Sequence, residues 1–156
     1  MKRRLIDRHS FALKKDMAQI IDKALPKREA RESAFLIVFE KLFSPDLTFD
    51  DVVSNNEISD FFNIDGFTKN LVNSVFDNLE MIDGIISKHL IDWTFDRISN
   101  VSKSLLRLGT AELKFRNTDS KVVFNEMVLL AKKYSDQKDA SFVNGILASI
   151  ETEVRG

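Results

Sequence analysis

The 156-residue sequence predicts an all-α protein, a two-lobed helical bundle of about six or seven helices with an extra helix at the N-terminus. Apolar residues recur at spacings of three and four through most of the chain, which is the pattern of amphipathic helices. No segment alternates apolar and polar residues for long enough to form a strand. We expect an extension over residues 1–25, then lobes at about 26–92 and 93–156 that divide near Trp93.

The first predicted helix lies within residues 5–25 and ends before Pro26. Its apolar face carries Leu13, Met17, Ile20, Ile21 and Ala24. Residues 1–31 contain ten Lys or Arg against four Asp or Glu, whereas the remainder contains thirteen against twenty. This asymmetry suggests an anionic partner for the N-terminal end of the chain.

Three further stretches complete the first half of the chain. Pro26 can open a helix from about Lys27 to Phe43, because proline is tolerated in a first turn. Residues 46–65 hold six acidic residues and no basic one, and they predict a short helix and loops. The apolar stripe from Asp65 to Leu90 is free of proline and predicts the longest helix of the chain.

The second half begins with a helix from about Asp96 or Ile98 to Phe115, and a helix-turn-helix then spans Lys121 to Ile146. Asn125, Asn144 and Gly145 lie inside these last helices, although Asn and Gly lower helix propensity by up to about 1 kcal/mol each. Either the Asn side chains cap neighbouring backbone and the glycine permits close helix packing, or these residues serve a function.

The sequence offers no chemistry typical of an enzyme. It has no cysteine, which excludes disulfides, thiol catalysis and thiolate metal sites. His9 and His89 lack companion ligands at metal-site spacing, and the isolated glycines form no phosphate loop. Asp46, Asp50 and Asp51 lack the spacing of a calcium loop. No apolar run approaches the roughly 20 residues of a membrane span, so we expect a cytoplasmic protein without cofactor or metal.

Several runs taken together resemble the NusB family of bacterial transcription antitermination factors. They are KREARESAF (27–35), FTKNLVNSVFDNLEMIDGIISKHL (67–90), WTFDRISNVSKSLLRLGTAEL (93–113), KVVFNEMVLLAKKY (121–134) and SFVNGIL (141–147). The resemblance implies a two-lobed helical protein, not an enzyme, that binds single-stranded, boxA-like RNA in nascent ribosomal RNA transcripts. It also implies pairing with NusE, a ribosomal small-subunit protein, within the RNA polymerase antitermination complex.

The residues and the resemblance agree on a basic surface for RNA. Three cations lie near a helix N-terminus, where unpaired backbone N–H groups add positive potential that favours phosphates. Phe142 could stack on a base, although it fits the core stripe equally well, and an Asn amide could bond a base edge. The predicted RNA-binding residues are Lys27, Arg28, Arg31, Asn125, Lys138, Phe142 and Asn144.

For the partner, the resemblance implies that NusE docks over exposed parts of the helices Lys27 to Phe43 and Ile98 to Phe115. Phe39 and Glu112 are the candidate contacts. A homodimer is a further possibility for the same protein. Two other functions stay open: a helical scaffold that binds only protein, and a stand-alone relative of the NusB-like domain of ribosomal RNA m5C methyltransferases, whose catalytic cysteines this chain lacks.

Three features depart from the family pattern. Glu29 interrupts the basic run, no proline precedes the run KVVFNE, and residues 1–25 have no family counterpart. This extension could lengthen an RNA track through Arg3, Arg4 and Arg8, or its apolar face could dock on the N-terminal lobe. We favour docking.

Overall fold

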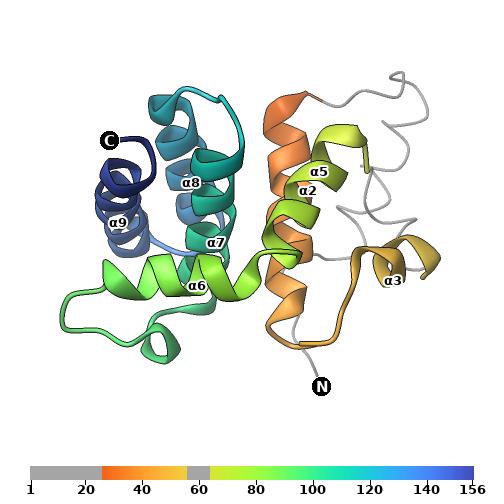
Figure 1. Ribbon diagram of the computed structural model, residues 1–156, viewed down its shortest axis with the longest axis horizontal. Coiled ribbons are helices and arrows are strands. Elements are labelled where there is room, and N and C mark those ends of the chain that lie inside the picture. The colour runs from red at the N-terminus through yellow and green to blue at the C-terminus, as the bar shows by residue number, and fades with distance from the viewer. Residues whose placement is uncertain (1–25, 56–63) are drawn as a thin grey trace. The chain divides into compact units, whose positions relative to one another are not determined.

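The computed structural model describes residues 26–55 and 64–156, and every regular element in these ranges is a helix (Figure 1). The elements are α2 (Lys27–Lys41), α3 (Phe49–Ser54), α5 (Gly66–Phe76), α6 (Leu79–Lys88), the 3-10 helix η1 (Phe95–Arg97), α7 (Asn100–Phe115), α8 (Ser120–Tyr134) and α9 (Gln137–Arg155). The all-α prediction is therefore confirmed. The helix expected within residues 5–25 lies outside the described residues.

The chain forms two compact units, one ending at Asn73 and the other beginning at Ser74. In the first unit, α2 begins directly after Pro26, whose carbonyl accepts a hydrogen bond from the backbone N–H of Ala30 at 3.0 Å. The rings of Phe35, Phe39 and Phe43 follow one another along this helix, with centroids 6.1 and 5.3 Å apart. The predicted helix from Lys27 to Phe43 is thus present and ends at Lys41.

Side-chain caps define the two shorter helices of this unit. Thr48 and Asp51 form a capping box at the start of α3, which is the short helix expected within residues 46–65. At the start of α5, the Asp65 carboxylate accepts hydrogen bonds from the backbone N–H and the hydroxyl of Thr68. The same hydroxyl also lies 3.3 Å from the carbonyl oxygen of Ala30, and this contact connects α5 to α2.

The long helix predicted from Asp65 to Leu90 is wrong, because the structure breaks it between Phe76 and Leu79 into α5 and α6. Asn78 makes the break: its side-chain amide donates to the carbonyl of Ser74 at 2.9 Å, and its backbone N–H donates to the carbonyl of Val75. Asp and Asn compete with helical hydrogen bonding in this way. The apolar stripe continues across the break, so periodicity alone did not reveal it.

In the second unit, α7, α8 and α9 pack against one another and α6 packs against α7 (Figure 1). The apolar residues of α7 and its approach pack inward and are buried, namely Ile98, Val101, Leu105, Leu106 and Leu108. Arg107 forms a two-pronged ion pair with Asp83 of α6, with both N–O distances 2.8 Å. The unit begins at Ser74, earlier than the expected division near Trp93, because α6 packs with α7.

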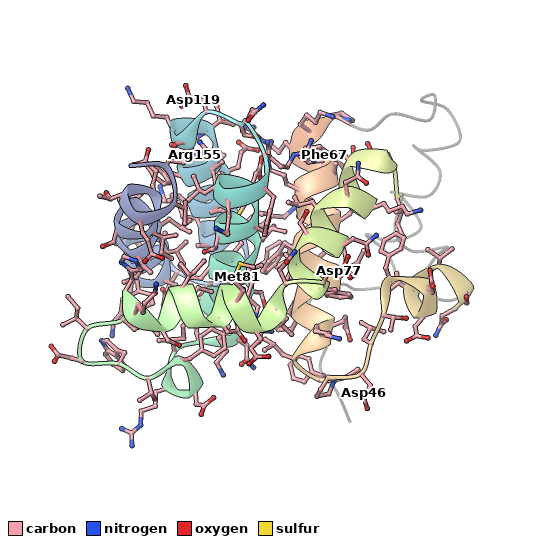
Figure 2. All side chains as sticks on the ribbon, viewed as in Figure 1. Asp46, Phe67, Asp77, Met81, Asp119 and Arg155 are labelled. Carbon is pink, nitrogen blue, oxygen red and sulfur yellow. The ribbon has the colours of Figure 1, made fainter. Side chains whose placement is uncertain are left out.

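Arg155, in the last turn of α9, holds the connector between α7 and α8 (labelled in Figure 2). Its guanidinium donates to the carbonyl oxygens of Leu113, Arg116 and Thr118 at 2.7, 2.8 and 2.6 Å. The carbonyls at a helix C-terminus lack helical partners and attract a cation. This contact fixes where α8 starts relative to α9.

Candidate nucleic-acid interface

The basic cluster of α2, defined as Lys27, Arg28 and Arg31, is only partly exposed. Lys27 and Arg28 are exposed, whereas Arg31 is buried at 5% exposure. The Lys27 ammonium lies 4.3 Å from the centroid of the Phe67 ring and the Arg31 guanidinium 5.2 Å from it (Phe67 is labelled in Figure 2). Cations over an aromatic face are held by the ring quadrupole. Phe67 therefore positions Lys27 and Arg31 at the start of α2.

The first turn of α2 adds positive potential at the same place. The residue before the helix is Pro26, whose side chain supplies no capping hydrogen bond to the first N–H groups. Backbone N–H groups at a helix start attract anions together with the helix dipole. Glu29 is the acidic residue of that turn and opposes the field.

A groove between α8 and α9, with a volume of about 420 Å³, brings together two of the predicted RNA contacts. We call it the amide groove. Its lining residues are Lys121, Phe124, Asn125, Val128, Gln137, Ala140, Ser141 and Asn144. Phe142 and Lys138 are not among them: Phe142 is half-buried and Lys138 is exposed elsewhere on α9.

Side-chain hydrogen bonds fix the start of α8 and the start of α9 around the amide groove. Asp119 caps α8 through the N–H of Lys121, and Asp136 caps α9 through the N–H of Asp139. The carboxylate of Asp139 in turn accepts hydrogen bonds from the hydroxyls of Ser99 and Ser135. Just two residues, Ser135 and Asp136, connect the helices, so α8 and α9 form a helical hairpin.

The structural explanation offered for Asn125, Asn144 and Gly145 does not hold. Both asparagines are exposed, and within the described ranges neither side chain caps the backbone of its helix. A Cβ added at Gly145 would meet nothing within 4 Å, so this glycine does not permit a close helix contact. Gly109 of α7 does so instead, since a Cβ there would lie 2.8 Å from Leu147 Cδ1.

The structure buries both candidate partner residues. Phe39 is 6% exposed and Glu112 is fully buried. The sequence pattern could not reveal this, because α2 and α7 are buried around most of their circumference. Contact of these side chains with NusE stays a prediction.

The histidines and carboxylates supply no metal site in the described part of the chain. Among those residues, no group of three or more His, Asp or Glu could hold a metal ion. His89 pairs with Glu153 at 2.8 Å, and Lys88 pairs with the same carboxylate at 2.9 Å. Hydrogen bonds from Lys88 and then His89 lower the pKa of Glu153. His9 lies outside the described residues.

Within the same ranges, none of the helices has both the length and the apolar character required to cross a membrane.

Sequence reasoning missed Lys121, Gln137 and Ser141 as members of the amide groove. A signal was present, because Gln137, Ser141 and Asn144 are spaced at i, i+4 and i+7 and so share one face of α9. Lys121 and Asn125 are likewise four residues apart on α8. Which faces meet across the hairpin depends on packing and could not be deduced from spacing alone.

An exposed cationic helix start and an amide-lined groove are features of a helical adaptor that binds nucleic acid or protein. The NusB family matches residues 28–152, so the chain belongs to the NusB family.

Curated relatives and solved structures agree with this assignment. The transcription antitermination protein NusB of Fervidobacterium nodosum is 39% identical over 138 residues, covering 88% of this chain and 89% of that protein. NusB of Bacillus subtilis is 35% identical, covering 83% and 98%. The structure of T. maritima NusB has a TM-score of 0.74 at 32% identity, covering 85% and 94%. A chain from a structure of antitermination factors NusB and NusE with dsRNA has a TM-score of 0.67 at 35% identity, covering 81% and 96%.

Proposed function

We propose that this chain is a bacterial transcription antitermination factor, not an enzyme, that binds boxA-like RNA together with NusE. The single observation that carries the proposal is membership of the NusB family across residues 28–152. A solved relative that was determined with NusE and dsRNA supports both partners. A factor of this kind would act in the cytoplasm, on nascent ribosomal RNA within the RNA polymerase antitermination complex.

Phosphates of the RNA are assigned to the basic cluster of α2. Lys27 and Arg28 are exposed beside helix N–H groups without a side-chain cap, which suits an anion. Arg31 is buried over Phe67 and contributes its charge from within. Lys138 adds a separate cation on α9, and the half-buried Phe142 offers part of its ring to a base.

The partner surface rests on the family resemblance alone. Phe39 and Glu112 stay the candidates, and their burial gives them no added support. Phe39→Ala tests whether Phe39 is a core residue or a contact for NusE. Loss of a core phenylalanine destabilises a protein by about 3–5 kcal/mol. A variant that stays folded but fails to bind NusE supports the contact, whereas one that unfolds places Phe39 in the core.

Fluorescence anisotropy with labelled RNA tests the function as a whole. We expect a single-stranded, boxA-like RNA to bind more tightly than a scrambled one, and NusE to increase the affinity of the unaltered protein. A double-stranded RNA forms a second arm, since the solved relative was determined with dsRNA. A protein that binds NusE but no RNA would be the protein-only scaffold, and the proposal would then be wrong.

A further inference from the structure

We propose that the amide groove between α8 and α9 is a pocket for one unpaired nucleobase, whose edge is bonded by the side chains of Asn125 and Asn144. This inference rests on the RNA-binding function proposed above. It names the part of the RNA that this surface takes and the residues that read it.

Asn125 and Asn144 lie well inside α8 and α9, where each weakens the helix by several tenths of a kcal/mol relative to alanine. Their side chains are exposed and cap neither helix within the described part of the chain. Folding therefore gives no reason for amides at these positions, and both line the same groove.

Asn125 and Asn144 each present a donor and an acceptor to the groove. The Gln137 amide donates to the Ser141 hydroxyl at 3.2 Å, and its amide oxygen adds a further acceptor. Phe124 and Val128 supply apolar surface beside them. A nucleobase has the same combination, namely apolar faces and an edge of alternating donors and acceptors, and amides pair with such edges through two hydrogen bonds.

The charge of the groove favours a base over other ligands. Lys121 is the single cation of the lining, and the lining contains no carboxylate. A site for several phosphates would need more cations, while a site for an apolar peptide would need fewer amides. One lysine beside neutral amides fits a base with the phosphate of its own nucleotide.

Two of the other predicted RNA contacts on α9 are not part of the groove. Phe142 and Lys138, which the sequence grouped with the asparagines, do not line it. A base in the groove is thus held by hydrogen bonds to amides, rather than by stacking on Phe142. Such a site needs an unpaired Watson–Crick edge, so it is specific for single-stranded RNA.

The test combines protein variants with RNAs that lack one base. The variants are Asn125→Ala and Asn144→Ala, and the matched control is Asn117→Ala, an exposed asparagine of the α7–α8 connector outside the groove. Alanine has a higher helix propensity than asparagine, so both groove variants should fold. Circular dichroism verifies this. The probes are a single-stranded, boxA-like RNA and a series in which each nucleotide in turn is abasic, measured by fluorescence anisotropy.

With the unaltered protein, we expect one abasic position to weaken binding on the order of tenfold, as loss of a two-bond base contact does. Asn144→Ala should weaken binding of the intact RNA to a similar extent. The same variant should show no further loss of affinity for that abasic RNA. Asn117→Ala should match the unaltered protein throughout. The dependence of affinity on salt should be unchanged, because no charge is removed.

If the loss of affinity from Asn144→Ala adds to the loss from the abasic RNA at every position, the base pocket is wrong. The RNA-binding function would still stand. The same holds if both groove variants bind RNA normally but bind NusE weakly, since the groove would then be a protein contact. If the unaltered protein binds none of the RNAs, the proposed function itself fails, and the base pocket fails with it.

Discussion

At the scale of single residues, close packing in the second unit depends on Gly109. A Cβ there would lie 2.8 and 2.9 Å from the two terminal carbons of Leu147 and 3.3 Å from Met127 Cγ. All three residues are buried, so their side chains have little space in which to move. The absence of a side chain at this position is what allows α7 to approach α8 and α9 closely.

We therefore expect Gly109→Ala to destabilise the protein by about 1–3 kcal/mol, the usual penalty for overpacking a core. Gly84→Ala is the matched control, because a Cβ at Gly84 of α6 meets nothing within 4 Å and alanine should stabilise that helix by up to about 1 kcal/mol. Urea unfolding of both variants measures the difference. Equal stability of the two variants would contradict the packing explanation.

Glu153 should make the stability of the folded protein depend on pH. Hydrogen bonds from Lys88 and His89 lower the pKa of Glu153, so its ionised form is favoured in the folded state. A depressed folded pKa contributes stability that is complete above the ordinary glutamate pKa of about 4.3 and is lost as pH falls through the folded value. Glu153→Gln should thus lower the melting temperature at neutral pH and have little effect at strongly acidic pH.

Thermal unfolding across this pH range checks that sign. Glu80→Gln, at an exposed glutamate of α6, controls for the loss of one negative charge. The ion pairs of Glu153 are partly exposed and salt-screened, so the effect should shrink at high salt. A difference between Glu153→Gln and the unaltered protein that grows toward low pH would refute the pKa assignment.

At the scale of elements, α2 joins core packing to the proposed phosphate contacts. Its apolar residues from Ala34 to Phe39 are buried, while Lys27 and Arg28 in the first turn are exposed. Changing either cation to alanine should weaken the binding of all RNAs alike. It should also reduce the slope of log affinity against log salt by about 0.7, the value for one phosphate on a single strand. Anisotropy titrations at several salt concentrations measure this slope.

Stability separates the three cations of the cluster. Lys27→Ala and Arg28→Ala should change the free energy of unfolding by less than about 0.5 kcal/mol, as is usual at exposed positions. Arg31→Ala should be more destabilising, because Arg31 is buried and packs over Phe67. An unchanged salt slope in all three variants would remove the cluster from the RNA site.

The helices themselves could largely be predicted from the sequence, since each carries its own signal. Pro26 marks the start of α2, and the apolar spacing of Val101, Leu105 and Leu108 defines the buried face of α7. The break at Asn78 escaped notice because the apolar stripe runs through it. A local amide-to-carbonyl bond decides that break, and periodicity does not register such a bond.

The candidate site was less predictable, because it depends on how helices pair. The types of Asn125 and Asn144 drew attention to them, but their meeting in one groove with Lys121 follows from the packing of α8 on α9. The burial of Arg31 and Phe39 has the same origin. The sequence shows which face of a helix a residue occupies. It does not show which other element packs on that face, because this depends on the tertiary structure.

At the scale of the whole molecule, charge is distributed unevenly along the chain. Residues 1–25 contain seven Lys or Arg against three Asp or Glu, so removing them changes the net charge from −1 to −5. An RNA-binding protein with a net negative charge depends on local basic surfaces, since its overall field repels the phosphates. We therefore expect the charge of the extension to raise RNA affinity modestly, even without direct contact.

Deleting residues 1–25, which lie outside the described part of the chain, tests the two roles predicted for them. We favour docking through Met17, Ile20 and Ile21, because an isolated helix of this length is marginal in water. Deletion should then lower the melting temperature by exposing apolar surface, and reduce RNA affinity modestly through the lost long-range charge. An RNA arm would instead leave stability unchanged and decrease the salt slope clearly, so calorimetry and salt-dependent anisotropy on the truncated protein distinguish the two.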